Sequence, residues 1–149
     1  MKPRKSHRLA VMAGAAMLAT AISGAPAASA RTTETGCGPE VELGSVVYQA
    51  CSDILVVGSV DYGTEPFMYA RNRGITSVVV TVELQRWNYT TSSWETDSTG
   101  PRTIAASGDT RYFSPAHTWS CGQDARERVR ATTSVGTGDW AEVVTPAPC

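Results

Sequence analysis

The stretch that decides the fold class is Ile75-Thr-Ser-Val-Val-Val-Thr-Val-Glu-Leu-Gln-Arg-Trp87. Apolar and polar residues alternate along it. One face of an extended chain therefore carries the apolar residues Val78, Val80, Val82 and Leu84, and the other face carries Thr81, Glu83, Gln85 and Trp87. A period of two residues predicts a half-buried antiparallel strand, with one face on a core and the other in water.

Shorter segments on both sides have a similar composition. Valine, threonine, serine and glycine dominate, and these residues favour strands and turns. We expect further strands at residues 45–50, 52–60, 94–98, 101–106, 109–113, 127–133 and 139–145, with a turn at 136–138. About seven or eight short strands predict an all-β, antiparallel, immunoglobulin-like β-sandwich, with a small closed β-barrel as the alternative.

The first 30 residues have the three-part pattern of a secretory signal peptide. A basic start at residues 1–8 precedes an apolar run at 9–22, and small residues lead to an expected cleavage after Ala30. The apolar run is shorter than the roughly 20 residues that span a bilayer, so we expect a secreted protein without a membrane anchor. Residues 31–36 are expected to be a flexible leader and residues 37–149 a single domain.

The charge balance argues against a nucleic-acid partner. The first 30 residues hold four of the 13 lysine and arginine residues and none of the 14 aspartate and glutamate residues. The rest of the chain therefore has 9 basic and 14 acidic residues, a net charge of −5, and every cation in it is an arginine. Phosphate backbones need clustered lysine or arginine, so nucleic acid is not an expected partner. We also expect a monomer and no cofactor.

Four cysteines follow the signal segment, and an even count in a secreted chain predicts disulfides. Of the three possible pairings we favour Cys37–Cys51 and Cys121–Cys149, since each closes a local loop near one end of the chain. No two cysteines have the close spacing of a zinc knuckle, so no metal site is expected.

The segment from Trp87 to Trp94 is expected to form a hairpin with aromatic residues in both arms. If residues 90–93 form the loop, Tyr89 pairs with Trp94, and both tryptophans lie on the outer face with Tyr89. If residues 89–93 form the loop, Asn88 pairs with Trp94, and Trp94 turns into the core. A shift of one residue reverses the face of a strand, and both loop lengths are common.

The residues Val80-Thr-Val-Glu-Leu-Gln-Arg86 and Ser93-Trp94 resemble a group of small secreted actinobacterial proteins. These proteins have a valine-rich strand, an "LQR" or "LQK" segment, a short polar turn and "SW". The resemblance implies a disulfide-stapled β-sandwich and no particular activity. It also implies a structural role for Trp94, which favours the five-residue loop.

Catalytic chemistry has little support in the sequence. His117 is the only histidine after the signal segment, no Gly-x-Ser-x-Gly motif accompanies it, and a polar surface position is expected for it. The carboxylate pairs Glu40/Glu42 and Glu95/Asp97 are interpreted as solvated positions on strands. We therefore expect a protein without enzymatic activity.

The sequence favours a secreted binding module that acts outside the cell on an unidentified polymer or protein, with a cell-wall or extracellular glycan as one possible ligand. The candidate binding residues are Trp87, Tyr89, Trp94, Arg128 and Arg130. Aromatic rings stack on sugars or anchor proteins, and arginines on one face of a strand suit an anionic polymer. The alternatives are a secreted inhibitor of a protease or amylase, with a braced loop near Cys121, and then a small hydrolase.

Overall fold

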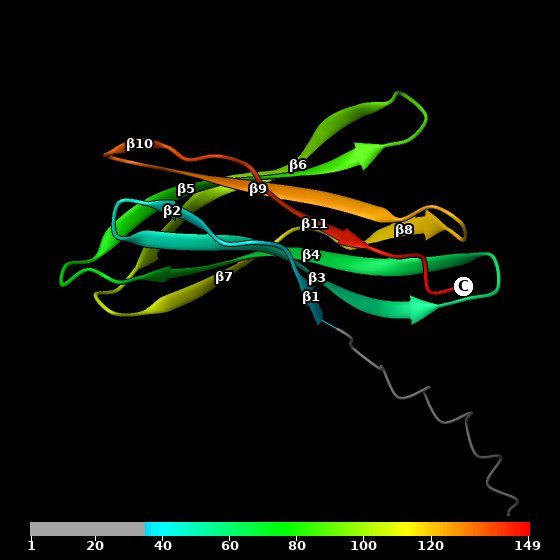
Figure 1. Ribbon diagram of the computed structural model, residues 1–149, viewed down its shortest axis with the longest axis horizontal. Helices are drawn as coiled ribbons and strands as arrows, with labels where there is room; N and C mark the ends of the chain where they lie inside the picture. The colour runs from blue at the N-terminus through cyan, green and yellow to red at the C-terminus, as the bar shows by residue number, and fades with distance from the viewer. Residues whose placement is uncertain (1–34) are drawn as a thin grey trace, which may run out of the picture.

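The computed structural model describes residues 35–149, so the expected signal peptide and residues 31–34 of the expected leader lie outside the described residues. Within this range, eleven strands form two antiparallel sheets that stack as two layers (Figure 1). Neither sheet closes on itself. The β-sandwich is therefore confirmed, and the closed barrel is excluded.

Sheet A contains β1 (Thr35–Cys37), β2 (Val41–Leu43), β3 (Val46–Val57), β4 (Asp61–Asn72), β7 (Asp109–Phe113) and β8 (His117–Ser120). Sheet B contains β5 (Val78–Asn88), β6 (Ser93–Ile104), β9 (Ala125–Thr133), β10 (Gly136–Thr137) and β11 (Ala141–Thr145). In sheet A, β3 and β4 lie in the middle, with β1 and β2 beside β3 and with β7 and β8 beside β4. In sheet B, β9 lies between β5 and the two short strands β10 and β11, and β6 is the opposite edge.

The core lies between the sheets and is built by the alternation that the sequence predicts. Val80, Val82 and Leu84 of β5 are fully buried, while Thr81 on the same strand is exposed. Burying one such aliphatic side chain stabilises the fold by about 1.5–3 kcal/mol. The other fully buried apolar side chains of this core include Val46, Tyr48, Ala50, Met68, Ala70, Ile104, Val129, Ala131 and Ala141.

Two pairs of expected strands are each one longer strand. The two segments expected at 45–50 and 52–60 form the single strand β3, which ends at Val57, because Cys51 pairs in register with Phe67 instead of interrupting the strand. The segments expected at 94–98 and 101–106 are likewise joined in β6, which ends at Ile104. Pro101 is tolerated there because β6 is an edge strand, where the missing N–H group of proline leaves no ladder bond unmade.

Short strands also replace an expected leader and an expected turn. Thr35 and Gly36, which were expected in the flexible leader, pair with β3 as part of β1. Gly136 and Thr137 were expected in a turn, but they pair with the end of β9 as β10. Segments of two or three residues carry too little periodicity to be recognised in a sequence, so these differences come from tertiary pairing.

The structure forms the two disulfides favoured from the sequence, Cys37–Cys51 and Cys121–Cys149. The first joins β1 to β3 within sheet A. The second joins the end of β8 to the chain that follows β11, and it therefore connects the two sheets. Close to the first disulfide, a Cβ atom on Gly38 would lie 1.9 Å from the carbonyl oxygen of Glu142, so only glycine fits at this approach of the sheets.

Candidate binding face

The β5–β6 hairpin, whose tip extends beyond the other strands in Figure 1, places Trp87 directly opposite Trp94. Their rings meet edge to face, with centroids 5.5 Å apart. The loop is residues 89–92, so both expected registers are wrong: neither Tyr89 nor Asn88 lies opposite Trp94. Trp94 therefore shares the outer face of sheet B with Trp87, and the core position implied by the resemblance is corrected.

The side chain of Asn88 explains this register. Its Oδ1 accepts hydrogen bonds from the backbone N–H groups of Thr90 and Thr91, at 2.8 and 3.2 Å. Its Nδ2 donates to Glu95 Oε1 at 2.7 Å. Ser92 closes the loop in the left-handed region, at φ 51°. An asparagine that binds its own turn competes with simple strand pairing, and this effect is invisible to a count of loop residues.

Six side chains interleave on the outer face of sheet B, and we call them the Trp–Arg ladder: Trp87, Trp94, Trp140, Arg126, Arg128 and Arg130. The central member is Arg128, whose Cζ lies 4.2 Å from the ring centroids of both Trp94 and Trp140. Arg130 lies 4.5 Å from the Trp140 ring, and Arg126 lies 5.2 Å from the Trp87 ring. Alternate residues of a strand are roughly 6.6 Å apart, which leaves room for one ring between successive guanidinium groups.

The three arginines of the ladder differ in how their charge is compensated. Arg126 forms an ion pair with Glu142 at 2.8 Å, and Arg130 forms one with Glu83 at 2.7 Å. Both pairs run across neighbouring strands, from β9 to β11 and from β9 to β5. Arg128 donates two hydrogen bonds, at 2.9 and 2.7 Å, to the neutral amide oxygen of Gln85. The ladder therefore carries its net positive charge at its centre.

Two ionisable groups in the ladder have shifted pKa values. Burial lowers the pKa of Arg128, since water is partly excluded from the guanidinium group. For Glu83, burial acts to raise the pKa, but the hydrogen bond and the charge of Arg130 outweigh it, and the pKa lies below its ordinary value. The carboxylate of Glu83 is thus held in its ionised form as a fixed partner of Arg130.

The structure brings together four of the five candidate binding residues: Trp87, Trp94, Arg128 and Arg130 belong to the ladder. Tyr89 does not. Its ring packs edge to face on Trp119, with centroids 6.4 Å apart, and its hydroxyl donates to the carbonyl oxygen of Asp124 at 2.8 Å. Tyr89 therefore braces the hairpin loop against the chain that leads into β9.

Trp140 is a ladder residue that was not among the sequence candidates, although the sequence holds a signal for it. Trp140, Glu142 and Val144 alternate with the buried residues Ala141 and Val143. The final strand was expected to begin at residue 139, and the same period-two rule would have placed Trp140 on the outer face.

A second polar cluster lies between the sheets, near the hairpin. The side chain of His117 is only 15% exposed, so its expected surface position is wrong. Its Nε2 lies 2.8 Å from Asp97 Oδ2, and the other carboxylate oxygen of Asp97 accepts a hydrogen bond from Arg86 Nε at 3.0 Å. This contact ties β8 of sheet A to β5 and β6 of sheet B.

Glu127 is a buried carboxyl group next to this cluster and is only 1% exposed. Thr64 Oγ1 donates to its Oε1 at 2.8 Å, and Trp119 Nε1 in turn donates to Thr64 Oγ1. Its Oε2 has no hydrogen-bond partner among the described residues. Burial raises the pKa of Glu127, and the nearby hydroxyl groups of Ser52 and Thr64 act in the opposite direction without reversing the shift.

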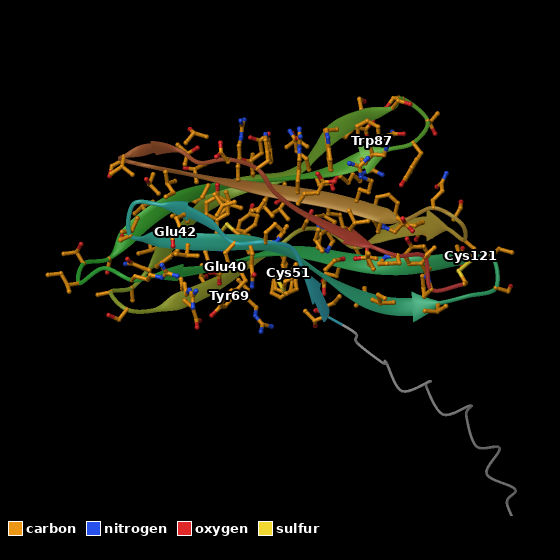
Figure 2. The ribbon with its side chains drawn as sticks, in the orientation of Figure 1. Glu40, Glu42, Cys51, Tyr69, Trp87 and Cys121 are labelled. Carbon is orange, nitrogen blue, oxygen red and sulfur yellow. A yellow bond between two sulfur atoms is a disulfide. The ribbon has the colours of Figure 1, made fainter. Side chains whose placement is uncertain are left out.

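Both carboxylate pairs considered in the sequence, Glu40/Glu42 and Glu95/Asp97, form ion pairs with arginine. Arg71 contacts Glu40 at 2.9 Å, and Arg73 contacts Glu42 at 2.8 Å, on the outer side of sheet A. Figure 2 shows Glu40 and Glu42 in the layer opposite to Trp87. Glu95 and Asp97 both contact Arg86. Residues 35–149 bring no three His, Cys, Asp or Glu side chains into an arrangement that suits a metal ion.

No protein-family model and no curated protein matches this chain. A structure of a Northeast Structural Genomics Consortium target is similar at a TM-score of 0.47 and 11% identity, over 70% of this chain and 88% of that one. A β-glucosidase from Kluyveromyces marxianus in complex with glucose is similar at a TM-score of 0.29 and 11% identity, over 78% of this chain and 14% of the enzyme. A β-glucosidase from Listeria innocua is similar at a TM-score of 0.30 and 13% identity, over 78% of this chain and 16% of the enzyme. These likenesses carry no argument about function, and the resemblance to small secreted actinobacterial proteins stays a prediction. No helix long and apolar enough to cross a membrane occurs in the described range.

Proposed function

We propose that this protein is a secreted, non-enzymatic binding module that recognises an extracellular glycan through the outer face of sheet B. The Trp–Arg ladder is the observation that carries this proposal. Its three indoles and three guanidinium groups are only partly buried. They therefore present aromatic and hydrogen-bonding surface to a ligand. Side chains of these types dominate the energetics of many binding interfaces.

The rigidity of the ladder supports a role in binding. Every ring lies beside a guanidinium group, and every guanidinium group is fixed by an acceptor on a neighbouring strand. A surface that is already ordered loses little conformational entropy when a ligand binds. The face is therefore organised before any ligand arrives.

The proposed extracellular location has two independent supports. The first 30 residues have the pattern of a secretory signal peptide. The described cysteines form two disulfides, and such bonds persist in oxidising compartments.

The alternative functions have weaker support from the geometry. An inhibitor would present a braced loop near Cys121, but residues 117–120 pair with β4 and belong to sheet A. A small hydrolase would place His117 in a cleft. Instead, the side chain of His117 points between the sheets, where it lies against Asp97.

Co-sedimentation of the oxidised protein with peptidoglycan, chitin and cellulose tests the proposal. We expect the protein to pellet with at least one of these glycans and the Trp87→Ala variant to lose this binding. Arg111→Ala is the matched control, because Arg111 is exposed on the outer side of sheet A. Equal pelleting of all three proteins would contradict a site on the ladder, and no pelleting of the wild type would contradict binding to these glycans.

A further inference from the structure

We infer that the ligand of this face is a linear polysaccharide that carries carboxylate groups, and that it extends from the Trp–Arg ladder into a hydroxyl-lined groove. This inference rests on the proposed function. It adds a second part to the site and a chemical class for the ligand.

The ladder selects for acidic groups because its ring faces are already covered. Two guanidinium groups lie near each of these rings, at 4.2 and 5.5 Å from Trp94 and at 4.2 and 4.5 Å from Trp140, so a sugar ring has little access to their faces. The groups left to a ligand are ring edges and N–H donors. Indole and guanidinium groups donate hydrogen bonds and do not accept them, so the face suits a ligand rich in acceptor oxygens.

Arg128 is the residue that would bind a carboxylate group of the ligand. The guanidinium groups of Arg126 and Arg130 are each paired with a glutamate, whereas Arg128 contacts only the neutral oxygen of Gln85 among its hydrogen-bond acceptors in the described chain. A carboxylate beside Arg128 would form a charge-assisted hydrogen bond without displacing an internal ion pair.

The groove lies at one end of the ladder, where β5 and β9 separate. These strands pair from Thr81–Thr132 to Arg86–Glu127, and β5 continues back to Val78 without pairing to β9. The space that this separation leaves is about 550 Å³. It is lined mainly by hydroxyl side chains, namely Thr76, Ser77, Thr81, Thr132, Thr133 and Ser134, together with Val78 and Val79.

The groove and the ladder form one continuous track along β5 and β9. On the outer face, the pair Thr81–Thr132 at the mouth of the groove is followed by Glu83–Arg130 and then by Gln85–Arg128. The six residue-to-residue steps from Thr81 to Trp87 cover about 20 Å of strand. A site of this length suits several linked units of a polymer. The groove offers hydroxyl groups to sugar hydroxyls, and the ladder offers a cation to the acidic group.

Isothermal titration calorimetry with soluble polygalacturonate and with its fully methyl-esterified form tests the inference, because the ester keeps the sugar backbone and removes the charge. We expect polygalacturonate to bind at least tenfold more tightly than the ester. Arg128→Gln should weaken binding of the acid about tenfold and should lower the ratio of acid affinity to ester affinity severalfold. Thr132→Val should weaken binding of both polymers about fivefold, since it removes one groove hydroxyl. Arg111→Gln is the control, and circular dichroism checks that each variant is folded.

Each contrary outcome overturns a different part of the two proposals. Equal affinity for the acid and the ester would overturn the acidic ligand while the proposed glycan function stands. An unchanged Thr132→Val variant would overturn the role of the groove. Dextran sulfate binding that is as tight as polygalacturonate binding and insensitive to Arg128→Gln would reduce the interaction to bulk charge. Failure of every soluble and insoluble glycan to bind would overturn both proposals.

Discussion

Replacing Arg128 by methionine measures what holds the Trp–Arg ladder together. Methionine keeps a flexible apolar side chain of similar reach and removes the guanidinium group. Two cation–π contacts at 4.2 Å and the hydrogen bonds to Gln85 disappear. Partly exposed cation–π contacts contribute about 0.5–1 kcal/mol each, and the hydrogen bonds from a charged donor add a comparable amount. We expect the free energy of unfolding to fall by about 2 kcal/mol.

Urea denaturation followed by far-UV circular dichroism measures this loss. The midpoint should move to a lower urea concentration while the slope stays constant, because the surface exposed on unfolding barely changes. Arg111→Met is the matched control. Arg111 is exposed, and its guanidinium group lies 5.4 Å from the ring of Phe67, so we expect a loss of no more than about 0.5 kcal/mol.

A double-mutant cycle of Arg128→Met with Trp140→Leu isolates one contact of the ladder. We expect a coupling energy of about 0.5–1 kcal/mol that persists in 1 M salt, because a partly desolvated cation–π contact is screened less than an exposed ion pair. If Arg128→Met costs no more than Arg111→Met, or if the coupling is zero, the ladder does not stabilise the sheet and our interpretation of its rigidity is wrong.

Three further predictions concern the fold. Glu127→Gln should leave stability unchanged at pH 4 and raise it at pH 8. The reason is that a carboxyl group with a raised pKa stabilises the fold below its ordinary pKa and loses this contribution as the pH rises through the folded-state value. Urea midpoints at both pH values check this, and a loss of stability at pH 8 would show that the carboxylate is favourably paired. Replacing both Cys121 and Cys149 by alanine should cost about 3–4 kcal/mol, from the entropy of opening a loop with a sequence separation of 28 residues, and an unchanged urea midpoint under oxidising conditions would contradict that model. Gly38→Ala should lower the melting temperature by more than 5 °C, since its Cβ atom would meet the Glu142 carbonyl at 1.9 Å, and a melting temperature equal to that of the wild type would mean that the two sheets separate easily at this point.

The part of the fold that sequence could predict depends on long period-two segments. The alternation in β5 and β9 gave the inner and outer faces correctly, and so identified Arg128 and Arg130 as outward residues. The hairpin register failed because it depends on hydrogen bonds that the side chain of Asn88 makes with its own turn. The polar cluster around His117 and Glu127 was also out of reach, since it joins strands that are adjacent only after the sheets stack.

The candidate site was predictable in its residue types and not in its assembly. Four of the five candidate residues meet on one face, but the alternation of rings and guanidinium groups requires β5, β6, β9 and the residue before β11 to converge across sheet B. Such convergence depends on strand order, and the periodicity of a single segment does not predict strand order.

The ladder also makes the protein its own optical reporter. Three of the four tryptophans lie on the outer face of sheet B, each near a guanidinium group, and only Trp119 is buried. Intrinsic fluorescence of the native protein should therefore arise mostly from the surface and not from the core. A molecule that reaches the ladder should change the emission without any attached dye, so a library of saccharides can be screened with the unmodified protein in a plate reader.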